Sequence, residues 1–239
     1  MPLWRTDELN LAPFGGGYGK MNYMNTNLNT IKILCYGDSN TWGQDPTQRG
    51  TRHPVTVRWT GLLQEKLGDN YWIIEEGLSG RTTVLDGDPR EGKNGKTYLK
   101  PCLETHNPID IVILMLGTND LKEMFHQSPQ DIANNVEVLV KMIQEFGWNS
   151  NKQAPKIVLL SPPFVDESVP GVQEKYKGAE EKSKELGEYY QQVAEKYACT
   201  FINIAEHISP SKSDGYHLDP DAHKSISEIL EKTVKDIAK

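Results

Sequence analysis

Cysteine is scarce in this chain of 239 residues, which holds three. Cys35, Cys102 and Cys199 lie far apart, in segments whose patterns predict strand or helix interiors. A disulfide framework needs cysteines in pairs, and a zinc site needs closely spaced ligands. The sequence therefore predicts neither, and it favours a reducing compartment such as the cytoplasm.

Long hydrophobic runs are also missing. No stretch approaches the roughly 18 apolar residues that a transmembrane helix needs, and the N-terminal segment has no apolar core of the kind found in secretory signals. We therefore expect neither a membrane span nor export by such a signal.

Positive charge is in deficit. The chain has 26 Lys and Arg against 33 Asp and Glu, a formal net charge of -7. Nucleic acids and anionic membranes are bound through clustered Lys and Arg, which displace counterions. The sequence has no such cluster, so we expect neither partner.

What is present indicates one folded domain. Hydrophobic residues make up 37% and charged residues 25% of the chain, a balance outside the range of disordered proteins. Residues 1–29 are rich in Gly, Asn and Met without a hydrophobic period, and we interpret them as a tail or arm. Residues 30–239 contain no repeat or linker and are predicted to form a single catalytic domain.

Short apolar runs alternate with longer amphipathic segments across this domain, as in parallel sheets covered by helices. The run at 109–116, Ile-Asp-Ile-Val-Ile-Leu-Met-Leu, is typical of a central strand buried on both faces. Strands are predicted at 30–36, 71–75, 109–116, 156–160 and 200–204, and helices at 57–67, 129–146, 179–197 and 219–237. This order predicts an α/β fold: a single-domain, three-layer, doubly wound parallel sheet flanked by helices, similar to flavodoxin.

Small and polar residues follow the predicted strands. In such a sheet, ligands bind beyond the carboxyl ends of the strands, on the loops that begin there. Those loops carry Gly-Asp-Ser-Asn at 37–40, Gly-Leu-Ser-Gly-Arg-Thr at 77–82 and Gly-Thr-Asn-Asp at 117–120; Asp-Gly-Tyr-His at 214–217 precedes the last helix. We therefore expect these four segments to meet at one edge of the sheet.

Three of these residues are the types that nucleophilic catalysis requires. A serine hydroxyl attacks an ester only when a base removes its proton and a third group orients that base. Ser39 supplies the hydroxyl. Asp214, three residues before His217, can hold the imidazole ring as base. Activity is then expected to fall at low pH, because a protonated His217 cannot accept the serine proton.

Developing negative charge on the attacked ester also needs hydrogen-bond donors. The backbone N–H of Ser39, the backbone N–H of Gly80 and the side-chain amide of Asn119 are the candidates. Together they are predicted to form an oxyanion hole, and no metal or organic cofactor is needed.

The four segments, in this order, resemble the blocks of the SGNH-hydrolase superfamily, a GDSL-like class. By resemblance, Ser39 is the nucleophile, Asp214 and His217 complete the triad, and Gly80 and Asn119 are oxyanion-hole donors. The resemblance covers about residues 31–239. The chain departs from the usual pattern at Asn40, where leucine is common.

Longer strings resemble the bacterial aryl esterase, acyltransferase and acetylesterase subgroup. They are YGDSNTWG at 36–43, VRWTGLL at 57–63, EEGLSGRTT at 75–83, CLETH at 102–106 and VILMLGTND at 112–120. The resemblance implies hydrolysis of short, chiefly acetyl, esters through an acyl-enzyme, and a homo-oligomer. It also implies the alternative of acyl transfer to alcohols or to peroxide by the same residues, and an acetylated sugar is one candidate substrate.

Other interpretations stay open at this point. Asn40, Trp42 and Arg81 are candidate substrate contacts. Alternatively, Asn40 alters only local packing, Trp42 packs beneath the loop, and Arg81 holds its loop through an ion pair. A non-enzyme alternative is a carbohydrate-binding or scaffold protein on a hydrolase fold, which would require a missing chemical group.

A metal cluster is a further alternative, built from Asp214, His217, Asp219, Asp221 and His223. Against it, Asp219, Pro220 and Asp221 have the pattern of a cap and first turn of the last helix. The remaining histidines, at 53, 106, 126 and 207, have no partner spacing that singles them out. The loop 161–172 is expected to form a rim over the site or to contact another subunit.

Overall fold

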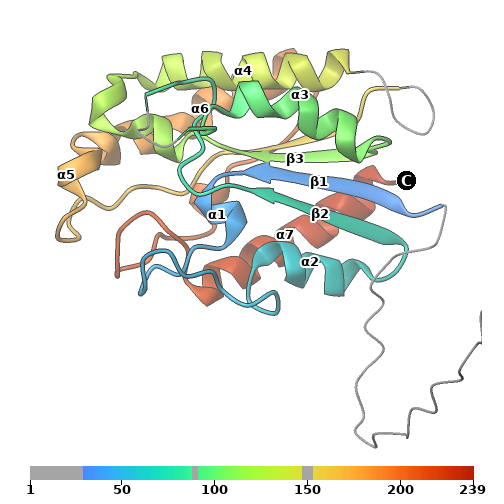
Figure 1. Cartoon of the computed structure of the whole chain (residues 1–239), viewed down its shortest axis with the longest axis horizontal. Helices are drawn as coiled ribbons and strands as arrows, with labels where there is room; N and C mark the ends of the chain where they lie inside the picture. The colour runs from blue at the N-terminus through green and yellow to red at the C-terminus, as the bar shows by residue number, and fades with distance from the viewer. Residues whose placement is uncertain (1–28, 88–90, 147–152) are drawn as a thin grey trace, which may run out of the picture.

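A parallel five-stranded sheet forms the centre of the protein. The computed structural model describes residues 29–87, 91–146 and 153–239, so the predicted tail lies outside the described residues except for Asn29. The strands are β1 (Ile31–Gly37), β2 (Tyr71–Gly77), β3 (Ile111–Met115), β4 (Lys156–Leu160) and β5 (Thr200–Ile202). They are ordered β2-β1-β3-β4-β5, all parallel (Figure 1). The predicted α/β class is confirmed.

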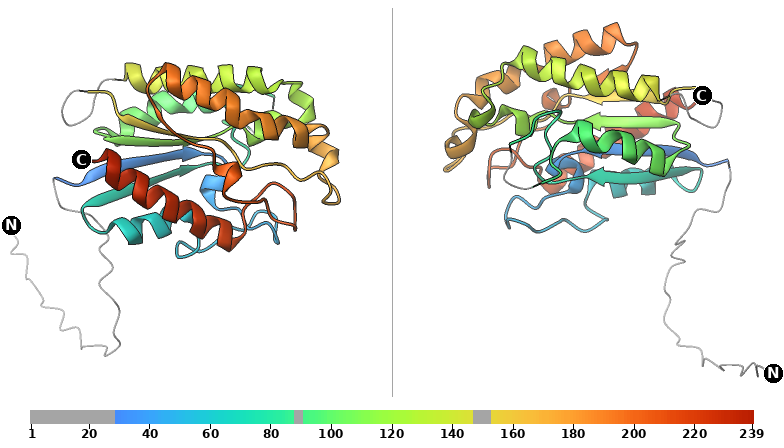
Figure 2. Two further views of the ribbon diagram at one scale, coloured as in Figure 1. Left: turned by 180° about the vertical axis from the view of Figure 1, so that it is seen from behind. Right: turned by 45° about the horizontal axis from the view of Figure 1, so that its top comes forward.

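Helices cover both faces of this sheet. They are α1 (Ser39–Trp42), α2 (Trp59–Leu67), α3 (Gly95–His106), α4 (Pro129–Glu145), α5 (Gln173–Tyr176), α6 (Ala179–Lys196) and α7 (Pro220–Ile237). Helices α2 and α7 pack together on one face, and α3, α4 and α6 lie on the other (Figures 1 and 2). The molecule therefore has three layers.

Local sequence explains where these helices form. In α4, the buried residues Ile132, Val136, Leu139 and Ile143 recur at spacings of three and four and so share one face. The helix begins at Pro129, after Ser128, whose hydroxyl accepts from the Asp131 N–H at 3.1 Å while the Asp131 carboxylate accepts from the Ser128 N–H at 3.0 Å. This reciprocal capping satisfies backbone donors that the helix leaves unpaired.

Helix α3 was not predicted. Gly95 and Pro101 lie within it, and both residues are unfavourable in helices. The helix is stable here because Leu99, Cys102 and Leu103 are buried in the core on the α4 side of the sheet. Their i, i+3, i+4 spacing was the available signal, but the surrounding polar residues obscured it.

The strand order places the functional loops at a switch point. From β1 the chain moves to β2 on one side, and the next strand, β3, lies on the other side of β1. The loops that leave the carboxyl ends of β1 and β3 therefore diverge and leave a crevice, where ligands bind in such sheets. Ser39 follows β1 and Asn119 follows β3.

Within the described ranges, none of the helices combines the length with the apolar character that crossing a membrane demands.

Candidate active site

Ser39 begins the short helix α1 immediately after β1. The Asp38 carboxylate caps this helix by accepting from the Asn40 N–H at 2.9 Å. A Cβ on Gly37 would lie 2.0 Å from the Thr41 Oγ1 and 2.8 Å from the Met115 backbone oxygen. Only glycine fits there, so the strand can turn sharply and present the serine at the sheet edge.

Asp214 and His217 form a tight pair on the loop before α7. Their Oδ2 and Nδ1 atoms are 2.5 Å apart, and Asp214 Oδ1 accepts from the His217 backbone N–H at 3.0 Å. Gly215, between them, has φ of +78°, and a Cβ there would lie 2.6 Å from the Asp166 backbone oxygen. This geometry fixes the ring and leaves Nε2 for another partner.

Of the three expected oxyanion donors, two have no hydrogen-bond acceptor in the described structure and one has. Within the described residues, the backbone N–H groups of Ser39 and Gly80 donate to no protein acceptor. The Asn119 side-chain amide donates to the Arg81 backbone oxygen at 3.0 Å and makes a longer contact of 3.4 Å with Asp38 Oδ2. The hydrogen bond to Arg81 orients the Asn119 amide. The longer contact with Asp38 is weaker, and an oxyanion could replace it.

All five predicted residues line one cavity of about 850 Å³: Ser39, Gly80, Asn119, Asp214 and His217. They come from four loops that are far apart in the sequence. In the part of the chain that the structure describes, no hydrogen bond joins the Ser39 hydroxyl to the His217 imidazole. Such hydrogen bonds often form only once substrate binds, and both groups line the same cavity.

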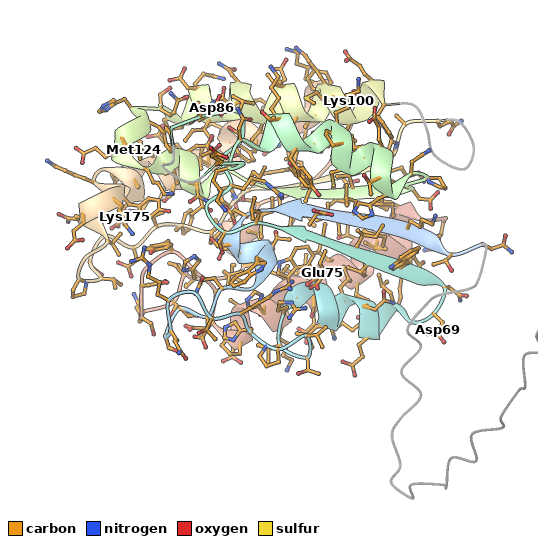
Figure 3. All side chains as sticks on the ribbon, viewed as in Figure 1. Asp69, Glu75, Asp86, Lys100, Met124 and Lys175 are labelled. Atoms are coloured by element: carbon orange, nitrogen blue, oxygen red, sulfur yellow. The ribbon has the colours of Figure 1, made fainter. Side chains whose placement is uncertain are left out.

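The rim of this cavity was missed by sequence reasoning. Its residues are Gln44, Asp45, Pro46 and Arg49 after α1; Lys122, Glu123, Met124 and His126 after β3; Glu174, Lys175 and Tyr176 at α5; and Ser79 and Tyr216. Met124 and Lys175 lie at the end of the molecule near α5 (Figure 3). The expected rim loop 161–172 instead buries Val165, Val169 and Val172 in the core and leads into α5. The long connections at strand ends were the only signal for these residues.

Asn40 does not line the cavity in the described structure; it joins two of its loops. Its Nδ2 donates to the Tyr216 backbone oxygen at 3.1 Å, and its backbone oxygen accepts from the Trp59 Nε1 at 3.1 Å. The side chain is buried. Asn40 therefore connects the serine loop to the histidine loop. This finding corrects its assignment as a substrate contact. The predicted effect on local packing is only part of its role, because its hydrogen bonds join two loops.

Trp42 and Arg81 are also absent from the described cavity wall. The Arg52 guanidinium lies 5.5 Å from the centre of the Trp42 ring, and Arg52 Nε donates to the Trp42 backbone oxygen at 2.6 Å. Arg81 is buried and donates to the backbone oxygens of Gly37, at 2.8 Å, and Glu76. Arg81 thus holds its loop through carbonyl groups, whereas an ion pair or a substrate contact was expected.

Two buried carboxyl groups lie behind the site. Burial raises the pKa of Asp38, although the Asn40 N–H, the nearby His217 and other groups oppose this shift. Burial likewise raises the pKa of Asp120 to about 7, against hydrogen bonds from Thr83, and the neighbouring Asp38 adds to the rise. Asp120 accepts from the Thr83 N–H at 3.1 Å and from the Thr83 hydroxyl. These contacts connect the Gly80 and Asn119 loops.

The Asp120 carboxyl predicts how stability changes with pH. An unfolded aspartate titrates near a pKa of about 3.9, whereas Asp120 in the fold titrates at about 7. Between these values the folded protein binds more protons, so this group lowers the unfolding free energy as pH rises. The Asp120→Asn variant is expected to lose this contribution, a few kcal/mol at about 1.4 kcal/mol per pKa unit. Urea unfolding from pH 4 to pH 8 measures it.

The matched control is Asp236→Asn, which changes an exposed carboxyl on α7. Its unfolding free energy should follow the pH dependence of the unmodified protein. If the unfolding free energies of Asp120→Asn and Asp236→Asn had the same pH dependence, the raised pKa of Asp120 would be contradicted.

The alternative metal cluster around His217 is not formed by the described residues. His223 is buried, and its Nδ1 accepts from the Trp59 N–H at 3.3 Å. Burial and the neighbouring His53 lower the pKa of His223 to about 3, so this ring is neutral. Asp219 is at the N-cap position of α7, as expected, although its side chain makes no capping hydrogen bond.

Comparison with protein families gives one match that spans most of the chain. The GDSL-like lipase/acylhydrolase family model matches residues 35–225. This range includes Ser39, Gly80, Asn119, Asp214 and His217.

Two solved structures that are similar to this chain are esterases. A carbohydrate acetylesterase from Sinorhizobium meliloti is 37% identical, with a TM-score of 0.82 and coverage of 87% of this chain and 100% of that one. An aryl esterase from M. smegmatis is 38% identical, with a TM-score of 0.81 and coverage of 87% and 99%.

A curated relative is an acetylxylan esterase from Xylanibacter ruminicola, 28% identical over 149 residues. The match covers 55% of this chain but only 28% of that relative, so the chain corresponds to about a quarter of its length.

Proposed function

Because the chain belongs to the GDSL-like lipase/acylhydrolase family, we propose that it is a serine esterase in which Ser39, His217 and Asp214 cleave short acyl esters. Family and relatives confirm the predicted carboxyl-ester hydrolase class. The acyl group, the alcohol and the roles of individual residues belong to the proposal. The observation that carries it is the convergence of hydroxyl, imidazole and carboxylate on one cavity.

In the first half of the reaction, Ser39 Oγ attacks the ester carbonyl carbon while His217 Nε2 accepts the hydroxyl proton. Asp214, at 2.5 Å from Nδ1, stabilises the resulting imidazolium. The carbonyl oxygen becomes an oxyanion, which the N–H groups of Ser39 and Gly80 and the Asn119 amide bind. Collapse of this intermediate expels the alcohol, which takes the proton from His217 and leaves an acyl-enzyme.

In the second half, water replaces the alcohol. His217 accepts a proton from the water as its oxygen attacks the acyl carbon, and the same donors stabilise the second oxyanion. Ser39 leaves with the proton that His217 held, and the acid is released. Every group required is already on the wall of the cavity, which argues against a non-catalytic scaffold.

The substrate that we propose is an acetyl ester of a carbohydrate. The cavity of about 850 Å³ holds far more than an acetyl group, and charged side chains such as Asp45, Arg49 and Glu174 line it beside a larger apolar surface. Tyr216 is half-buried and packs on the buried Tyr176, with ring centres 4.8 Å apart, and it adds aromatic surface on which a sugar ring can pack. The names of two relatives, a carbohydrate acetylesterase and an acetylxylan esterase, support the same class.

This proposal predicts a preference for short acyl chains. On acetyl, butyryl and octanoyl esters of one alcohol, kcat/KM is expected to fall by at least about 10-fold from acetyl to butyryl, because each misplaced methylene costs roughly 10-fold or more. Acetylated xylo-oligosaccharides should release acetate, measured by chromatography. Highest activity on octanoyl esters would contradict the proposed acyl group, and absence of acetate release from the oligosaccharides would contradict the proposed alcohol.

Acyl transfer uses the same residues and differs only in which acceptor reaches the acyl-enzyme. The ratio of acid to new ester in the presence of added alcohol distinguishes hydrolysis from transfer. We infer from the unpaired cysteines that the enzyme acts in the cytoplasm, and from the subgroup resemblance that it forms a homo-oligomer.

A further inference from the structure

Three metal-ligating side chains meet away from the catalytic cavity. Glu76 is on β2, and Cys102 and His106 are on α3, one helical turn apart. Their ligand atoms all lie within 4.8 Å of one another, and Glu76 Oε1 and His106 Nε2 are 2.7 Å apart. None of the three lines the catalytic cavity.

We propose that Glu76, Cys102 and His106 form a binding site for Zn²⁺. Zinc binds thiolate, imidazole and carboxylate, and three protein ligands with one water complete its preferred tetrahedron. Bonds of about 2.0 to 2.3 Å require ligand atoms that are roughly 3 to 4 Å apart. The separations in the described structure bracket that range, so rotation of side chains alone can bring the three groups to one ion.

The three ligands are accessible to a divalent ion, and together they can balance its charge. Cys102 is fully buried, while the side chains of His106 and Glu76 are 27% and 18% exposed, which leaves a path for entry. Binding removes the thiol proton to solvent and replaces the hydrogen bond between His106 and Glu76. Thiolate and carboxylate then neutralise the divalent ion, so the nearby Arg81 faces a formally neutral site.

Neighbouring groups would hold the ligands in place. Burial and the nearby Glu76 carboxylate raise the pKa of the Tyr98 hydroxyl, and a hydroxyl beside a carboxylate ligand can orient it in a metal site. Arg81 donates to the Glu76 backbone oxygen and, through its own backbone oxygen, accepts from Asn119. A bound ion would therefore join β2 to α3 at the base of the loop that carries Gly80, and stabilise the fold.

Cobalt reports directly on the thiol. CoCl₂ added to the full chain under reducing conditions is expected to give a thiolate-to-cobalt charge-transfer band that saturates at one equivalent. ZnCl₂ should abolish this band by competition and raise the Tm. Cys102→Ser should lose the band and bind Zn²⁺ at least about 10-fold more weakly, and Tyr98→Phe should keep the band with binding about 10-fold weaker.

Matched controls are Cys199→Ser and His207→Gln, which alter a half-buried thiol and an exposed imidazole elsewhere. Both should bind cobalt like the unmodified protein. A band that survives Cys102→Ser, or no saturable binding by the unmodified chain, would overturn the proposal. If Cys102→Ser does not fold, as judged by circular dichroism, His106→Gln replaces it, and an unchanged affinity in that variant is equally decisive. Activity is not the readout, because His217 in the catalytic cavity can itself bind zinc.

Discussion

Ser39→Ala is expected to lower kcat for acetyl esters by about five to six orders of magnitude, the scale of loss when a catalytic serine is removed. Without the hydroxyl no acyl-enzyme can form, and only binding and the oxyanion donors remain to accelerate attack by water. Initial rates on a chromogenic acetyl ester measure the loss. Mass spectrometry after rapid quenching should detect the acetyl-enzyme for the wild-type protein but not for Ser39→Ala.

The matched control is Ser79→Ala. Ser79 also lines the cavity, and its buried hydroxyl has no hydrogen-bond partner among the described residues. Its removal should change kcat by less than about 10-fold, since no step of the reaction uses it. Circular dichroism should show both variants folded. If Ser79→Ala were inactive and Ser39→Ala active, the nucleophile would be misassigned.

Asp214→Asn is expected to lower kcat by about four orders of magnitude. The carboxylate of Asp214 lies 2.5 Å from His217 Nδ1 and accepts a hydrogen bond from the Nδ1–H group, which leaves Nε2 as the base. An asparagine amide can donate to Nδ1 instead, so the ring proton moves to Nε2 and the serine proton has no acceptor. The asparagine oxygen can still accept from the His217 N–H, and the loop should keep its shape.

Asp219→Asn serves as the control, because Asp219 is two residues past His217 and makes no capping hydrogen bond with its side chain. Its kcat should stay within about threefold of the unmodified protein, because Asp219 does not line the described cavity and no step of the reaction uses it. KM should change little in either variant. A large rise in KM with unchanged kcat for Asp214→Asn would assign Asp214 to substrate binding and contradict its role as the orienting group.

Local pattern was sufficient for most of the fold. The apolar run before Gly117 became β3, buried on both faces, and the segment 156–160 became β4 with unchanged bounds. Amphipathic spacing likewise located α4 and α7 to within two residues. Helix α3 was missed because its stability comes from burial of Leu99, Cys102 and Leu103 against the sheet, which outweighs an unfavourable local composition.

The candidate site, like the fold, has a part that local sequence predicted and a part that it did not. Its five chemical groups lie in four short segments, three of them after strands and one before α7, and those segments could be recognised one by one. The rim could not be predicted, because the path of the chain in three dimensions, and no local pattern, brings Arg49, Lys122 and Lys175 to the cavity. Arg81 was misread for a related reason: its partners are backbone oxygens, and every sequence offers those everywhere.

By itself, the sequence determined the parallel sheet, the order of the four loops and which residues we propose as the reacting groups, because hydrophobic period and residue chemistry are local properties. Tertiary structure alone decided that Asn40 bonds to Tyr216, 176 positions away, and that Glu76 meets His106, 30 positions away. Such contacts depend on how helices pack on the sheet. Packing depends on the shape and volume of many side chains at once, and no short segment encodes it.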